Sequence, residues 1–140
     1  MVRFIPTNVH GVIDYVVGVV LIAAPWLFGF YAGGAESVVP LVLGAVVILY
    51  SLFTDYEAGM VRTIPVPVHL ALDGVVGLVL LLSPWLFGFA ALVLYPHLVV
   101  GMLVIVAALT TKTEPESGTT PPTAQETQRR AHPQGSERSR

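Results

Sequence analysis

The sequence has no cysteine and few charged side chains. Without cysteine, the chain has no disulfide frame, no thiolate nucleophile and no cysteine-ligated zinc or iron–sulfur site. Only 11% of the 140 residues are charged, whereas an ordinary soluble domain carries roughly 25%. The 7 basic and 9 acidic residues nearly cancel, so the chain lacks the basic surface that binds nucleic acid. These deficits exclude a soluble enzyme and predict no nucleic-acid partner.

The common catalytic and cofactor motifs are also absent. The sequence contains no Walker loop, no dinucleotide-binding glycine fingerprint, no His-Glu-x-x-His and no Gly-x-Ser-x-Gly. Each of these motifs places specific groups around a phosphate, a metal ion or a nucleophilic serine. We therefore expect no enzymatic activity and no cofactor.

Apolar residues make up 54% of the chain, and its mean hydropathy is +0.76. They gather in four segments, and a helix needs about 20 residues to cross the hydrocarbon core of a bilayer. Continuous apolar runs do not show the alternation of barrel strands. The sequence therefore predicts an all-α membrane protein with four transmembrane helices in contact with the lipid bilayer. The predicted helices are residues 9–30, 38–54, 68–90 and 94–110.

The last 28 positions, residues 113–140, have a different composition. They are rich in proline, threonine, serine, glutamine, glutamate and arginine, and they contain no large aliphatic or aromatic side chain. Such a segment buries too little apolar surface to offset its loss of conformational entropy. We predict that residues 113–140 form a disordered tail.

The chain contains an internal repeat. Residues 1–10 return as residues 60–69, a shift of 59 positions. The same shift continues along the first apolar segment of each copy. It pairs His10 with His69, Asp14 with Asp73, Gly18 with Gly77, Leu21 with Leu80, and residues 25–30 with residues 84–89.

A shorter loop in the second copy reduces the later shift to 57, so Leu41 matches Leu98 and Gly44 matches Gly101. The first unit is therefore residues 1–59, the second is residues 60–112, and each consists of two helices. Two crossings return the chain to its starting side. The two units should thus have the same orientation, related by a pseudo-twofold axis along the membrane normal.

The charges that flank the apolar segments predict the orientation in the membrane. Arg3, Arg62 and Lys112 lie at one side, whereas the two short loops of the other side carry no lysine or arginine. Basic residues are retained on the cytoplasmic side. We expect both termini and the tail to be cytoplasmic.

The two copies resemble a known family. Each has His-x-x-x-Asp near its start and a Pro-Trp pair near the end of the same segment; Ser83 precedes the second Pro-Trp, and Ala24 the first. The pattern resembles the SPW-repeat family of small bacterial and archaeal membrane proteins. The resemblance implies a multi-pass protein of the prokaryotic plasma (inner) membrane. It implies little about mechanism, because the family is largely of unknown function.

Four residues form the candidate polar cluster, namely His10, Asp14, His69 and Asp73. Residues four apart share one face of a helix, so each histidine can bond the aspartate of its own segment. One hypothesis is structural, either an ion pair within each segment or a clasp between helices. The other is a proton site or a metal site that both pairs share, which requires the first and third helices to bring the pairs together.

Other residues have structural interpretations. Pro25 and Pro84 each remove a helical hydrogen bond and predict a kink, and Ser83 is placed to bond the carbonyl group that Pro84 leaves free. Trp26 and Trp85 are interpreted as anchors at the membrane interface. A stripe of identical residues that runs from His10 to Gly29 should face protein, and His97 should lie at the outer interface.

Two functions remain open. The first is a structural, accessory or partner-binding component of the membrane, with a homo-oligomer or another membrane protein as partner. The alternative is a proton- or metal-linked transporter or sensor that uses the four His and Asp residues. Four helices enclose little more than their own side chains, so a transport pathway requires an oligomer.

Overall fold

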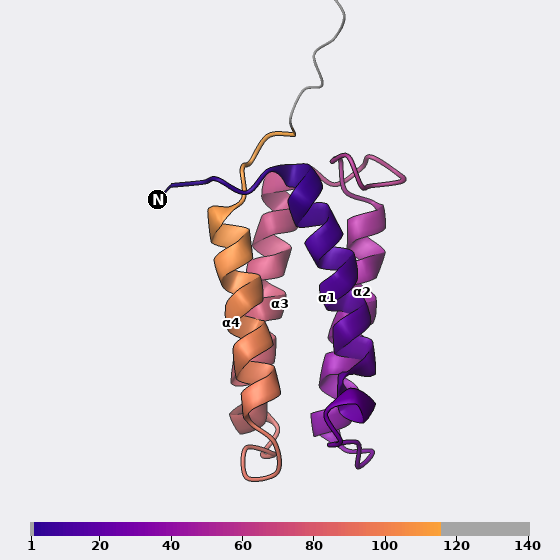
Figure 1. Cartoon of the computed structure of the whole chain (residues 1–140), viewed down its shortest axis with the longest axis vertical. Coiled ribbons are helices and arrows are strands. Elements are labelled where there is room, and N and C mark those ends of the chain that lie inside the picture. Colours follow the sequence, from indigo (N-terminus) through magenta and orange to yellow (C-terminus); the bar gives the residue numbers. More distant parts are fainter. Residues whose placement is uncertain (1, 116–140) are drawn as a thin grey trace, which may run out of the picture.

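The computed structural model describes residues 2–115 and contains four helices, as predicted (Figure 1). The helices are α1 (Thr7–Leu27), α2 (Ala35–Leu52), α3 (Val66–Leu86) and α4 (Tyr95–Thr110). Most of the predicted tail, residues 116–140, lies outside the described residues.

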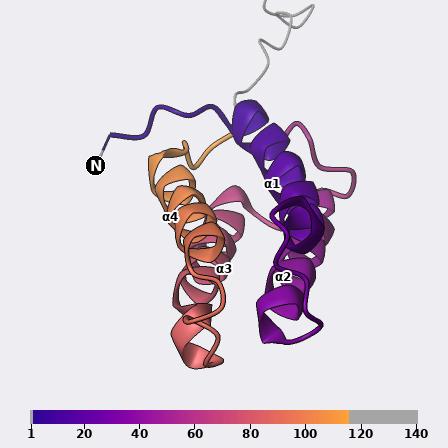
Figure 2. The ribbon, with the colours of Figure 1, turned by 60° about the horizontal axis from the view of Figure 1, so that its bottom comes forward.

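The helices form two hairpins that lie side by side. Helix α1 packs on α2 and α3 packs on α4, and both views separate these two pairs (Figures 1 and 2). The hairpins meet mainly through α2 and α3, whereas the contact between α1 and α4 is much smaller. The loops within the hairpins lie at one end of the bundle, and the α2–α3 connection lies at the other, with the start of α1 and the end of α4 (Figure 1).

Glycine pairs allow the helices of each hairpin to approach closely. A Cβ atom added to Gly44 of α2 would lie 2.5 Å from the backbone oxygen of Gly18 in α1. A Cβ atom added to Gly101 of α4 would lie 2.7 Å from the corresponding oxygen of Gly77 in α3. Small residues are a common device for packing helices within lipid. The repeat therefore places the same backbone contact in both hairpins.

The outer surface of the bundle is apolar. Valine, leucine and methionine side chains are exposed along the outside of the helices, among them Val12, Val16, Val19, Val75, Leu78, Val99, Met102 and Leu103. Helices α1, α2 and α3 are long and apolar enough to span a membrane. Helix α4 is shorter, with 16 residues, and lies alongside α3 (Figure 1). The chain is thus a multi-pass membrane protein by the composition of its helices.

Helices α1 and α3 end earlier than predicted, at Leu27 and Leu86 rather than at residues 30 and 90. The prolines therefore lie in the last turn of each helix, and the kink there remains a prediction. Gly29 follows α1 with φ 68°, in the left-handed conformation that glycine adopts after a helix. It is exposed, so the inward stripe ends before it.

The backbone hydrogen bonds after α1 explain this end. The Gly29 N–H donates to the carbonyl of Trp26, and the Phe30 N–H donates to the carbonyl of Pro25 at 2.9 Å. These two bonds make a Schellman motif, which satisfies the last carbonyls of the helix. In the second copy Ser83 Oγ donates to the carbonyl oxygen of Leu80 at 2.7 Å. The prediction for Ser83 is therefore confirmed.

The other end of the bundle is tied by short extended segments. Ile64, before α3, forms a parallel bridge with Thr54 after α2, and Ile5, before α1, forms the equivalent bridge with Thr111 after α4. Arg3 Nη1 also donates to the carbonyl of Thr111 at 2.7 Å. These bridges bring the start of α1 to the end of α4, and they position the first turns of α1 and α3.

Candidate functional site

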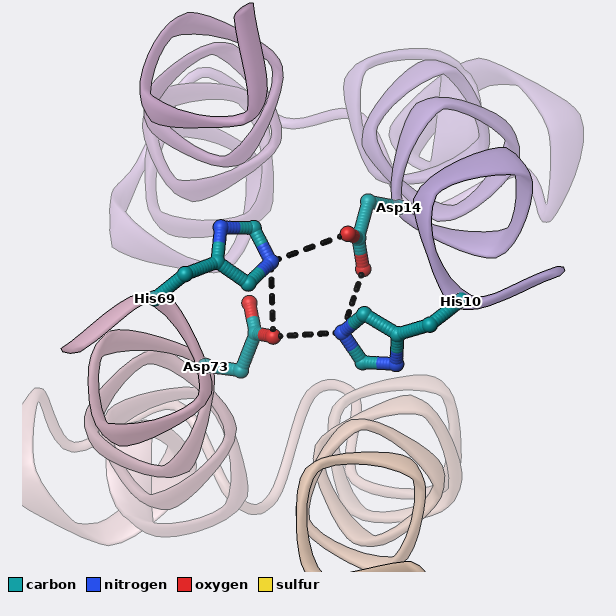
Figure 3. Close-up of side chains that lie close together, drawn as sticks. All are labelled: His10, Asp14, His69 and Asp73. Atoms are coloured by element: carbon teal, nitrogen blue, oxygen red, sulfur yellow. Dashed lines mark hydrogen bonds and ion pairs between the residues drawn. The ribbon is translucent and has the colours of Figure 1, made fainter. Parts of the chain in front are cut away.

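The four His and Asp residues lie in the first turns of α1 and α3 and point toward one another (Figure 3). His10 and Asp14 come from α1, and His69 and Asp73 come from α3. All four are buried, with 0% to 5% of each residue exposed. The helices thus bring both pairs into one place inside the bundle. We call these four residues the His/Asp ring.

Contacts between the helices are as short as contacts within them. His10 Nε2 lies 2.9 Å from Asp73 Oδ2, and His69 Nε2 lies 3.0 Å from Asp14 Oδ2. Within the helices, His10 Nε2 lies 3.3 Å from Asp14 Oδ1, and His69 Nε2 lies 3.1 Å from Asp73 Oδ2. Each imidazole therefore contacts both carboxylates, and neither pair is closed on itself.

Two threonines hold the outer nitrogens of the imidazole rings. Thr54 Oγ1 lies 2.8 Å from His69 Nδ1, and Thr111 Oγ1 lies 2.8 Å from His10 Nδ1. Each hydroxyl also donates to the carbonyl four residues earlier, at 2.7 Å. A hydroxyl has one proton to donate, so each threonine accepts from the histidine. Nδ1 therefore carries a hydrogen in both rings, and Nε2 faces the carboxylates.

Two tyrosines donate to the carboxylates. Tyr50 OH of α2 donates to Asp73 Oδ1, and Tyr56 OH, from the loop after α2, donates to Asp14 Oδ2 at 3.4 Å. Burial raises the pKa of Tyr56 above its usual range, so its hydroxyl keeps its proton and stays a donor. Both tyrosine rings also meet the His69 ring edge-on, at centroid distances of 5.0 and 5.2 Å.

The ring offers a set of ligand atoms for a metal ion. One nitrogen or oxygen from each of the four residues lies within 4.8 Å of all the others. Tetrahedral zinc, with bonds of about 2.0–2.2 Å, places neighbouring ligand atoms about 3.3 Å apart. The four contacts of 2.9 to 3.3 Å need to widen little to meet that geometry. The threonines supply the outer hydrogen bonds that orient metal-binding histidines in proteins.

The family model of the SPW repeat domain matches residues 8–111 of this chain. The chain belongs to the SPW repeat family. The matched span includes the whole His/Asp ring, both threonines and both Pro-Trp pairs. Searches of curated proteins and of solved structures find no match.

The residues that give the SPW repeat its name lie at the other end of the bundle from the ring. Pro25 and Trp26 occupy the last turn of α1, and Pro84 and Trp85 occupy the last turn of α3. Trp26 and Trp85 are 56% and 57% exposed, and Trp26 stacks on Tyr31 at 4.9 Å. Their role as interface anchors remains a prediction, which their exposure supports.

The SPW repeat protein buries a third histidine at this end. His97 of α4 is 1% exposed, its Nε2 lies 3.2 Å from the carbonyl oxygen of Glu36, and its ring packs against Phe30 and Phe89. His97 thus lies at the predicted outer end but packs inside the bundle, and its depth at the membrane interface remains a prediction. An aromatic ring beside an apolar loop is buried readily when a carbonyl accepts its polar hydrogen.

Four residues around the ring were not predicted from the sequence, namely Tyr50, Thr54, Tyr56 and Thr111. The repeat carries a signal for the threonines, because Thr54 and Thr111 are identical residues 57 positions apart. Extending the comparison of the copies to the ends of α2 and α4 would find both. It would also show that Tyr50 corresponds to alanine, Ala107, in the second copy.

Proposed function

We propose that this SPW repeat protein binds a divalent transition-metal ion through the His/Asp ring, and that binding rather than catalysis is its activity. One observation carries the proposal: both His/Asp pairs converge on a single buried ring, with each Nδ1 engaged by a threonine. The convergence favours the metal-linked interpretation over a clasp closed within each helix.

The charges of the ring suit a divalent ion. Two carboxylates and two neutral imidazoles leave a formal charge of −2 in a buried place, where unpaired charge is costly. One divalent cation cancels that charge, and in its absence two protons on the ring do the same. Metal binding to histidine and carboxylate ligands displaces protons, so we expect binding to release up to two protons for each ion.

The ligand types favour zinc and its neighbours over magnesium or calcium. Imidazole nitrogen suits Zn²⁺, Cu²⁺, Ni²⁺ and iron. Magnesium and calcium prefer ligand sets made of oxygen, whereas half of this set is nitrogen from His10 and His69. Zn²⁺ is therefore the first ion to test.

The second candidate is a structural clasp within a membrane component of accessory or partner-binding type. It is favoured by the contacts that every ring residue already makes with its neighbours. In that role the ring joins α1 to α3 across the bundle and needs no ion. A titration with Zn²⁺, described next, separates the two functions.

The titration uses the full chain, purified in mild detergent and stripped of metal with a chelator. We expect Zn²⁺ to raise the melting temperature of the parent, and Mg²⁺ to leave it unchanged. The double variant His10→Asn with His69→Asn should lose the shift. Asp55→Asn is the matched control, because Asp55 is an exposed carboxylate near the same end, and it should keep the shift.

Proton release into a weakly buffered solution with a pH indicator gives a second readout. A melting temperature that Zn²⁺ leaves unchanged in the parent, or raises equally in the double histidine variant, would overturn the metal site and favour the clasp. Circular dichroism of each variant before titration verifies that the helices remain folded.

The orientation of the site is also a proposal. Arg3 and Arg62 belong to the end of the bundle that holds the ring, and basic residues favour the cytoplasmic side. The chain lacks cysteine, so single cysteines give labelling without background. Glu114→Cys should react from the cytoplasmic side and Ala91→Cys from the opposite side. Labelling of both from one side would contradict this topology.

A further inference from the structure

The two hairpins meet along two faces that the repeat relates to each other. One face lies between α2 and α3, and the other lies between α1 and α4. At the α2–α3 face Tyr50, Val47 and Val76 form a buried apolar cluster, with Ile64 packed against it. Tyr50 is the largest member, and its hydroxyl reaches the His/Asp ring.

The equivalent residues of the α1–α4 face line a cavity. Under the repeat, Val47 becomes Val104, Val76 becomes Val17, Ile64 becomes Ile5 and Tyr50 becomes Ala107. All four of these equivalents line one cavity of about 300 Å³. The two faces thus share their aliphatic lining residues. The phenol ring of Tyr50 fills the α2–α3 face, and the α1–α4 face has no equivalent ring.

The cavity has a polar end where the missing hydroxyl would lie. Tyr50 OH donates to Asp73 Oδ1, and Asp14, the repeat equivalent of Asp73, lines the cavity. Asp14 Oδ1 lies 3.3 Å from His10 Nε2, and a carboxylate oxygen accepts more than one hydrogen bond. Ala107 has no side-chain donor for Asp14 Oδ1. This carboxylate oxygen therefore remains an acceptor at the end of an apolar cavity.

We propose that the α1–α4 cavity binds a hydroxylated aromatic ring, whose hydroxyl donates to Asp14 and whose ring packs on Val17, Val104 and Ala107. Tyr50 within the same chain is the template for this ligand. The proposal goes beyond metal binding and does not depend on it.

The size and the opening of the cavity fit such a ligand. A cavity of about 150 Å³ is enough to hold benzene, so a volume of about 300 Å³ holds a ring with a substituent. Leu103 and Val106 line the cavity and are 60% and 47% exposed on the lipid-facing side of α4. A ring dissolved in the membrane can therefore enter from the side, and an apolar tail can lie along α4.

The test uses p-cresol, which is the tyrosine side chain as a free molecule, with the full chain in detergent. We expect saturable binding by calorimetry and a rise in melting temperature. Toluene has the same ring without the hydroxyl and should bind at least tenfold more weakly. A parallel titration with 4-heptylphenol tells whether the site prefers a free ring or one with an apolar tail.

Two variants locate the binding. Ala107→Tyr should fill the cavity with the chain's own phenol and weaken p-cresol binding at least tenfold, and Ala107→Leu should do the same if the tyrosine variant folds poorly. Val99→Tyr is the matched control, because Val99 lies 55% exposed on α4, and its p-cresol affinity should equal that of the parent. Tyr50→Ala should open the equivalent face and add a second p-cresol site.

Three results would overturn the proposal. The first is equal affinity for toluene and p-cresol, which would indicate that the cavity holds only an acyl chain. The second is an unchanged p-cresol affinity in both Ala107 variants. The third is no p-cresol binding to the parent. The Zn²⁺ response of the Ala107→Leu variant is measured in the same samples. Since Ala107→Leu alters no ring residue, a lost p-cresol site with a kept Zn²⁺ response separates this proposal from the metal site.

Discussion

The two repeat units share their backbone plan but differ in the side chains around the ring. Both have a His/Asp pair, a glycine contact between their helices and a bridge after the second helix. Both also have a threonine that bonds the histidine of the other unit. Only the first unit has tyrosines against the ring, Tyr50 and Tyr56, and the second unit has Ala107 in the place of Tyr50. The shared parts build the bundle and the ring, and the unshared part makes one face packed and the other hollow.

The glycine contacts should give the largest effect if the shared plan is broken. A Cβ atom at Gly44 or Gly101 meets the backbone of the facing helix, and backbone has little room to move. We expect Gly44→Val and Gly101→Val each to destabilise the protein by about 3 kcal/mol, as overpacking does in tight interiors. Chemical denaturation in detergent measures the change.

Gly74 is the matched control for these glycines. A Cβ atom added there meets nothing within 4 Å, and alanine favours a helix over glycine by up to about 1 kcal/mol. Gly74→Ala should therefore be neutral or stabilising. Equal losses at Gly74 and Gly44 would contradict the close approach of the helices.

The ring should give the next largest effect. His10→Ala leaves Asp14 and Asp73 short of a buried donor, and such a loss costs about 1–3 kcal/mol. The cross-helix contact of 2.9 Å is shorter than the contact of 3.3 Å within α1. A double-mutant cycle should thus show coupling of His10 to Asp73 at least as large as its coupling to Asp14. Coupling to Asp14 alone would indicate pairs that act separately.

The sequence predicted the helices and the ring residues because both leave simple patterns. Apolar runs predict spans, and identical His-x-x-x-Asp segments in both copies mark His10 and His69. The end of α1 at Leu27 was missed, because residues 28–30 are apolar like the span, although Gly29 carried the signal of a helix end. The helix ends there because Gly29 adopts the left-handed conformation of a Schellman motif, and a hydropathy pattern does not contain this backbone information.

The assembly of the ring was beyond the sequence pattern. Whether α1 and α3 face each other depends on how the hairpins dock, and the repeat describes each hairpin but not their contact. Tyr50 lies within an apolar helix, where its hydroxyl has no local partner to suggest a role. Tyr56 reaches the ring from a loop, whose course the sequence does not specify.

The threonines should show whether the shared parts contribute equally. Thr54→Val and Thr111→Val each remove a hydrogen bond to a histidine and one to the carbonyl four residues earlier, and an ordinary hydrogen bond contributes about 0.5–1.5 kcal/mol. The two distances are both 2.8 Å, so we expect equal losses in thermal unfolding. Tyr50→Phe should add a loss of similar size, whereas nothing equivalent exists in the second unit. Unequal threonine losses would indicate that the two histidines differ in environment.

The smallest effect should come from the serine that only the second unit has. Ser83 Oγ bonds the carbonyl of Leu80, which Pro84 leaves without its helical donor. Ala24 holds the equivalent place in the first unit, and α1 and α3 nevertheless end at equivalent positions. The hydroxyl therefore adds little to the helix end, and we expect Ser83→Ala to cost about 0.5–1 kcal/mol, at the low end for a hydrogen bond. Ala24→Ser should recover a similar amount by bonding the carbonyl of Leu21. A loss above about 2 kcal/mol for Ser83→Ala, outside the usual range for one neutral bond, would mean that Ser83 has a further role at this end.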